Sequence, residues 1–170
     1  MQDQHRYLGK FPGTVVNTTD PQRRGRLQAK VPAVYGDTTG TWALPCFPVA
    51  GAEVGAFALP PVGAGVWIEF VGGNLEQPVW TGCFYADSGE LPDDALTGTP
   101  DRPNVVLQTA GKQTVILSDT PGGDGITLRS SSGASLVIND DGITISNGQG
   151  ASITLSGSTV SVNDGALSVS

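Results

Sequence analysis

The chain has 170 residues, including 24 glycines and 12 prolines, and carries a formal net charge of −7. Only 15% of its residues are charged, which argues against a disordered chain, and the acidic balance disfavours binding to nucleic acid or to anionic membranes. The composition therefore predicts one or two small, turn-rich domains of the all-β class.

The first residues carry no secretory signal, because residues 1–6 are polar and no apolar segment follows them. We therefore expect the protein to be made and assembled in the cytoplasm. Cys46 and Cys83 are then expected to be reduced and buried as small hydrophobic residues. Two cysteines and a single histidine, His5 in the polar tail, predict neither a metal site nor a cofactor.

Five strand-like segments occupy the first half of the chain, separated by Gly- and Pro-rich turns. A turn at 20–25 joins the first two segments into a hairpin, and 50–61 reads as an irregular connection. Alternation is clearest at 65–71, where Val66, Ile68 and Phe70 share one face. The expected strand segments are 10–19, 26–31, 42–46 (interrupted by proline), 65–71 and 78–85.

Five short strands in roughly 85 residues predict a Greek-key barrel of the OB type over residues 1–86. Residues 87–103 are acidic, Pro-rich and without periodicity, so they are expected to form a linker. The basic cluster of Arg23, Arg24 and Arg26 favours a solvated hairpin tip, with a contact to an acidic partner as the alternative. The expected core residues of the barrel are Val15, Leu27, Val31, Val66, Ile68, Phe70, Val79 and Phe84.

Residues 104–170 form a β-repeat, in which apolar residues come in pairs two positions apart and the pairs recur every 7 to 11 residues. Each pair lies on one face of a strand, and two apolar residues per strand cannot close a core within one chain. We therefore expect several copies to wrap around a common axis, with three as the smallest closed prism. The residues expected at this axis are Leu128, Ile138, Ile145, Leu155, Val162 and Val169.

No candidate catalytic site emerges from the sequence. The carboxylates at 93–94 and 140–141 are adjacent in turns, so their side chains diverge and cannot flank one bond as a glycosidase pair does. Residues 122–126 (GGDGI) partly match a calcium-binding turn, but a single copy favours a plain turn. Trp42, Trp67 and Trp80 could stack on bases, although strand cores or interfaces explain two of them and the net charge opposes nucleic acid.

The motifs of the first half, in this order and spacing, resemble the OB domain of phage baseplate spikes. That domain is shared with VgrG-type spikes of type VI secretion and with spikes of extracellular contractile injection systems. The final third is similar to the triple-stranded β-helix of the same spikes. The motifs that carry the resemblance are 7–16 (YLGKFPGTVV), Asp20-Pro21, Gly25-Arg26, Val31-Pro32, Trp42-Ala43, Pro45-Cys46, Leu59-Pro60, 66–70 (VWIEF), 72–74 (GGN) and 77–79 (QPV).

The resemblance implies a structural protein without enzymatic activity, a homotrimeric membrane-puncturing spike within a tail or injection particle. The barrel at 1–86 would meet a hub or inner-tube protein, and 104–170 would form the needle that meets the target membrane. A PAAR-type tip protein is expected to cover the last strand through Leu167, Val169 and Ser170, since an open strand edge exposes unpaired backbone. The alternative is a carbohydrate-active or receptor-binding β-helix tail protein. Phage tail, type VI apparatus and extracellular device all remain open.

Overall fold

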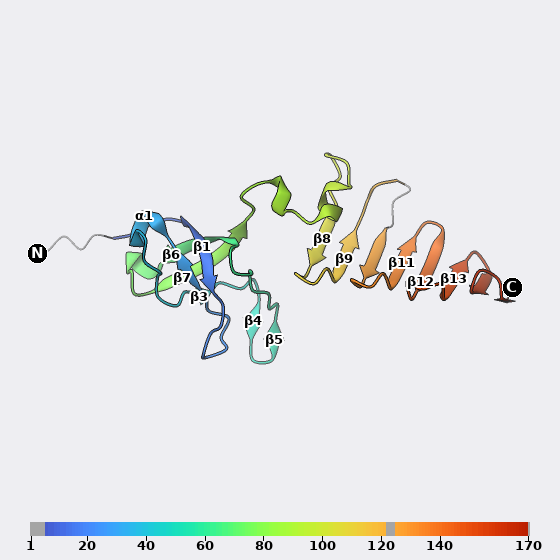
Figure 1. Cartoon of the computed structure of the whole chain (residues 1–170), viewed down its shortest axis with the longest axis horizontal. Coiled ribbons are helices and arrows are strands. Elements are labelled where there is room, and N and C mark those ends of the chain that lie inside the picture. Colours follow the sequence, from blue (N-terminus) through green and yellow to red (C-terminus); the bar gives the residue numbers. More distant parts are fainter. Residues whose placement is uncertain (1–5, 122–124, 170) are drawn as a thin grey trace, which may run out of the picture. The chain divides into compact units, whose positions relative to one another are not determined.

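The structure, a computed structural model, describes residues 6–121 and 125–169. The chain divides into two compact units, Met1–Ser88 and Gly89–Ser170. Strands dominate both units, and the helices of the described part span no more than four residues each (Figure 1). The prediction of an all-β chain is therefore confirmed. His5, Ser170 and residues 122–124 of the expected GGDGI turn lie outside the described residues.

The first unit is a five-stranded barrel. Its strands follow the order β2-β1-β6-β7-β3, and all pairs are antiparallel except β3 with β7. Leu27 and Ala43 exchange two backbone hydrogen bonds of 3.2 and 2.8 Å, which join the β2 side to the β3 side and close the barrel. The strands are β1 (Phe11–Asn17), β2 (Gln28–Lys30), β3 (Leu44–Pro45), β6 (Gly65–Phe70) and β7 (Pro78–Phe84).

The barrel core is built from inward-facing residues of these strands. Six of the eight expected core residues are buried, whereas Val79 and Phe84 are only half-buried. Trp80 takes the central place on β7 instead, and the ring of Phe84 packs on Trp67 with centroids 4.9 Å apart. The buried cluster contains Val15, Leu27, Ala29, Val31, Ala43, Val66, Ile68, Phe70 and Trp80.

Three short elements decorate the barrel. The helix α1 (Pro32–Tyr35) begins at a proline, whose fixed φ suits the first turn, and the Tyr35 hydroxyl donates to the Leu75 carbonyl at 3.1 Å. A small hairpin joins β4 (Ala50–Gly51) to β5 (Val54–Gly55), where an irregular connection was expected. The helical turn η1 (Val71–Gly73) links β6 to the loop before β7.

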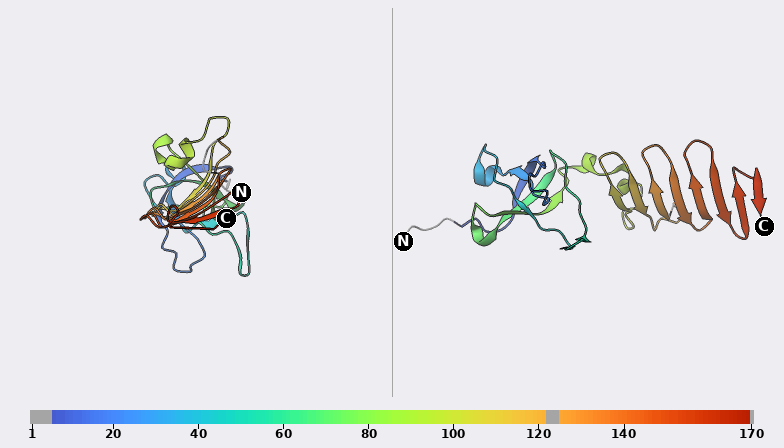
Figure 2. Two further views of the ribbon diagram at one scale, coloured as in Figure 1. Left: turned by 90° about the vertical axis from the view of Figure 1, so that its right-hand side faces the viewer. Right: turned by 90° about the horizontal axis from the view of Figure 1, so that it is seen from below.

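The second unit is one eight-stranded antiparallel sheet in the order β15 to β8 (Figure 2). Each strand pairs with its neighbour in sequence, so all seven ladders form within a single chain. The strands are β8 (Val105–Gln108), β9 (Thr114–Leu117), β10 (Ile126–Arg129), β11 (Ser135–Asn139), β12 (Gly142–Ser146), β13 (Ser152–Ser156), β14 (Thr159–Val162) and β15 (Leu167–Val169).

The acidic segment before β8 folds onto this sheet. It contains the helical turns η2 (Ser88–Glu90) and η3 (Asp93–Leu96). The Asn104 side-chain amide donates to the Asp94 carbonyl and to the Thr97 hydroxyl, both at 2.9 Å. The Asp94 carboxylate also pairs with the Arg129 guanidinium of β10. The segment at 94–97 is thus attached to Asn104, just before β8, and to β10 by both backbone and side-chain contacts.

Candidate trimerisation surface and barrel loop

One face of the second sheet consists of two columns of aliphatic side chains. Directly opposed residues of an antiparallel pair point to the same face, so the ladder registers place two residues from each strand side by side. The first column contains Val105, Leu117, Ile126, Ile138, Ile143, Leu155, Val160 and Val169. The second column contains Leu107, Val115, Leu128, Leu136, Ile145, Ile153, Val162 and Leu167. We call this surface the apolar face.

The apolar face is largely open to solvent in the single chain. Ile145 is 47% exposed, Ile153 40% and Leu155 38%, and of the sixteen column residues only Leu136, Ile143 and Val162 are half-buried. A contiguous exposed apolar surface of this kind marks an interaction site. Covering the open half of each such side chain would contribute about 1 kcal/mol per residue.

The opposite face of the sheet changes character along its length. Near β8 it carries Val106 and Ile116, and Ile116 is 5% exposed. Arg129, which pairs with Asp94, shares this face, so residues 93–96 lie over it. Further along the sheet, the residues that continue the line of Val106 and Ile116 on this face are polar, with the exception of Val137. Its polar members are Thr127, Thr144, Thr154 and Ser161.

All six residues expected at the trimer axis lie on the apolar face. They do not form one column, because the chain reverses direction at every turn and the second residue of each pair therefore alternates between columns. Leu128, Ile145 and Val162 stand in the second column. The other three, Ile138, Leu155 and Val169, stand in the first column. This two-column arrangement follows from antiparallel pairing of successive strands, so it could have been predicted from the sequence by working out the register of each hairpin.

The residues expected to meet a tip protein lie on β15, the strand at one edge of the sheet. Leu167 is 60% exposed and Val169 61% exposed, and both continue the columns of the apolar face. Ser170 lies outside the described residues.

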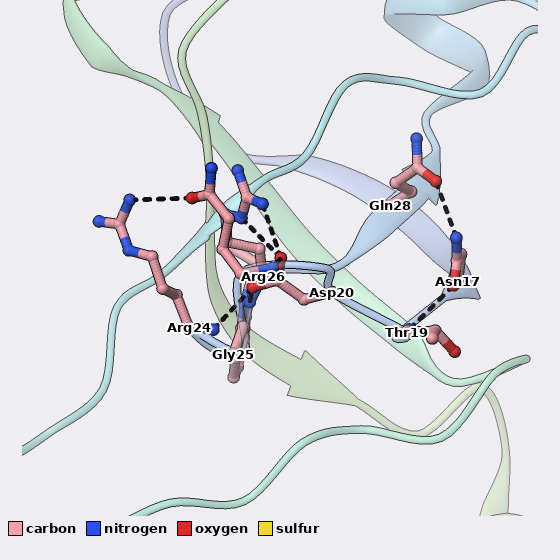
Figure 3. A network of polar contacts seen from close by, with 9 residues as sticks. Asn17, Thr19, Asp20, Arg24, Gly25, Arg26 and Gln28 are labelled. Atoms are coloured by element: carbon pink, nitrogen blue, oxygen red, sulfur yellow. Dashed lines mark hydrogen bonds and ion pairs between the residues drawn. The ribbon is translucent and has the colours of Figure 1, made fainter.

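In the barrel, Asp20 holds the loop between β1 and β2 (Figure 3). Its carboxylate accepts backbone hydrogen bonds from Gln22 at 2.9 Å, Arg24 at 2.8 Å and Arg26 at 3.3 Å. The Arg26 guanidinium adds two more, from Nε at 3.1 Å and from a terminal nitrogen at 2.6 Å. These contacts, the Arg26 side chain foremost, hold the pKa of Asp20 well below its usual range although burial acts in the opposite direction.

The three arginines of the basic cluster therefore have different environments. The Arg26 side chain is only 16% exposed, pairs with Asp20 and lies over the Trp42 ring, with 5.5 Å from its Cζ to the ring centroid. The expectation of a fully solvated tip is wrong for Arg26, because its guanidinium compensates a buried carboxylate. Arg23 and Arg24 are exposed as expected.

Both cysteines are free thiols, but the expectation that they are buried is wrong. Cys46 directly follows β3 and Cys83 is the penultimate residue of β7, and both are exposed. Strand ends leave the core of a small barrel, so a residue there has fewer neighbours. Over residues 6–121 and 125–169, no three side chains of His, Cys, Asp or Glu gather to hold a metal ion. Among these residues no helix has the length and apolar character needed to cross a membrane.

Comparison with known families matches both units. Residues 11–85 match the type VI secretion system/phage-baseplate injector OB domain, and residues 104–168 match the phage baseplate V C-terminal trimerisation domain. Comparison with curated proteins gave no match. The two ranges contain the closed barrel and the sheet with the apolar face. The chain belongs to the phage baseplate V family, the spike proteins of phage baseplates and type VI secretion injectors.

Proposed function

We propose that this protein is the central spike of a contractile tail or injection particle, and that its second unit is a trimeric, membrane-puncturing needle. The observation that carries this proposal is the apolar face. Its two columns run through all eight strands, and most of their side chains are exposed in the described part of a single chain. A trimerisation domain can bury such a surface between its three chains.

In the proposed needle, three sheets form the walls of a prism with their apolar faces inward. The two columns of each wall meet the columns of the other two walls, which buries the aliphatic side chains. Residues 93–96 stay outside, because they lie over the opposite face near β8. Eight strands stacked at ~4.8 Å give a needle of roughly 40 Å. Backbone ladders would run along each wall, and side-chain packing would hold the walls together.

The work of such a needle is mechanical. We propose that the barrel attaches the trimer to a hub or inner-tube protein and that a separate tip protein covers β15 through Leu167 and Val169. Contraction would then drive the needle into the target membrane. A dry, interdigitated interior resists axial load better than a solvated one, because each side chain keeps many dispersion contacts.

Electron microscopy of purified particles tests this placement. A gold label on an affinity tag at the N-terminus is expected at the axis of the baseplate, in a single cluster per particle. A label spread along tail fibres or along the sheath would contradict a central spike. Receptor-binding proteins, the alternative class, occupy those peripheral places.

A further inference from the structure

The barrel carries a second exposed apolar site, a groove between the loop at 20–26 and the β4–β5 hairpin. It encloses about 680 Å³, within the range of pockets that bind ligands or peptide side chains. Its apolar part includes Phe57 at 68% exposed, Val54 at 65% and Val49 at 55%. Single exposed apolar residues are ordinary on a surface, but three around one hollow are a patch.

The floor of the groove is built on the barrel core. Phe47 packs against Phe57 with ring centroids 5.4 Å apart, and against the buried Trp80 at the same distance. The Trp80 indole donates to the Gly25 carbonyl at 3.1 Å, which ties the loop to the core. Together with the five bonds to Asp20, this contact fixes the loop wall before any ligand arrives. A preformed site avoids the cost of ordering on binding.

Basic residues lie on one side of the groove rim and an acidic residue lies on the other. Arg23 and Arg24 line the loop side, and Glu53 lines the turn of the hairpin. The Arg24 guanidinium makes a long contact of 3.5 Å to the Gln22 side-chain oxygen. Both Arg23 and Arg24 are exposed, so their guanidiniums can bind carboxylates. They belong to nine basic residues in a chain of net charge −7, which makes the loop side a local exception on an acidic protein.

We propose that this groove docks a segment of a different protein, one that inserts an aromatic or aliphatic side chain against Phe47 and Phe57. Carboxylates next to that side chain pair with Arg23 and Arg24. A second copy of this chain is the competing occupant, and its binding in the groove would add mass beyond the trimer. The site is separate from the apolar face and goes beyond the trimeric spike.

A peptide array with the full-length protein tests the docking site. The probes are short peptides with Leu or Phe between Asp and Glu residues, and the matched set carries Lys in place of each acid. The protein is expected to retain the acidic set and not the basic one. The strongest acidic peptide, labelled with fluorescein, then serves in anisotropy titrations. Failure of every acidic peptide, or equal retention of both sets, would overturn the proposal.

Two matched pairs of variants locate the binding. The double variant Arg23→Glu/Arg24→Glu is expected to weaken peptide binding at least about tenfold. Its control, Lys30→Glu/Lys112→Glu, makes the same change in net charge at exposed positions outside the groove and should leave binding unchanged. Phe57→Ala should weaken binding similarly without lowering thermal stability, because Phe57 is mostly exposed. Equal loss in both double variants would show non-specific attraction and overturn the site.

Light scattering distinguishes between the two possible occupants of the groove, a different protein and a second copy of this chain. If the groove instead receives a second copy of this chain, molar mass will rise with concentration beyond the trimer, and Arg23→Glu/Arg24→Glu will abolish the rise. That result would overturn the assignment to a different protein. A constant molar mass together with peptide binding supports it.

Discussion

Thr154 and Leu155 are neighbours on β13 but lie on opposite faces of the sheet. Leu155 stands in a column of the apolar face, directly opposite residues of β12 and β14. Thr154 stands in the polar column of the other face. The pair offers a test of which face is buried between chains, with both substitutions on one strand.

Leu155→Asp is expected to abolish trimer formation. It places three carboxylates in the proposed interior, at a cost of more than about 3 kcal/mol per chain. Thr154→Asp adds the same charge one residue away and should leave the trimer intact. Sedimentation velocity of both variants measures the outcome. Trimers of equal stability in both variants would show that the apolar face does not lie at the interface.

The barrel should lose stability in acid through Asp20. Its pKa is depressed in the folded barrel, so the stabilisation from its ionised form is fully present above the unfolded pKa of about 3.9. It is lost as pH falls below that value towards the folded pKa. The melting temperature of Asp20→Asn should therefore lie several degrees below wild type at pH 7, and the gap should narrow between pH 4 and pH 2. A gap that is constant with pH would exclude this carboxylate as the cause.

Gly25 cannot carry a side chain without disturbing the groove floor. Its φ is +75°, and a Cβ would lie 3.0–3.1 Å from ring atoms of Phe47 and Phe57. Gly63, at φ +95°, has no atom within 4 Å of the same position, so Gly63→Ala reports backbone strain alone. Gly25→Ala should destabilise the protein by about 1–3 kcal/mol more than Gly63→Ala does, as overpacking requires. Urea unfolding followed by Trp fluorescence provides the comparison.

The segment at 89–103 should be protected from proteases by Asn104. Asn104→Ala removes two hydrogen bonds, each worth about 1 kcal/mol, and should speed thermolysin cleavage near Leu96 several-fold. Asn139→Ala, which removes a turn contact to the Asp141 amide, is the control and should not change cleavage there. Identical cleavage rates in both variants would mean that this segment is held by other contacts.

Local patterns sufficed to predict the eight strands of the second unit and the five strands of the barrel, but not the short strands β4 and β5. Each apolar pair spaced by two residues in the last third lies on a strand, and the alternation at 65–71 matches β6. These predictions succeed because the period of two is a local property of extended chain. The two-column arrangement depends on the register of successive hairpins, so the pairs alone did not reveal it.

Contacts between distant residues explain what the sequence did not predict. The helix α1 is four residues long and too short to stand alone, so its contacts with Leu75 and the ring of Phe70 support it. The loop at 20–26 looked like a simple basic turn because nothing local indicates that Asp20 is buried. The attachment of Asn104 and Arg129 to 93–97 likewise joins residues that share no sequence pattern.

Molar mass by light scattering tests the central claim most directly. The full chain is expected to have three times the mass of 17.4 kDa calculated for one copy, and a chain ending at Ser88 is expected to be a folded monomer. A full chain that stays at 17.4 kDa, with its sheet intact by circular dichroism, would contradict the trimeric needle.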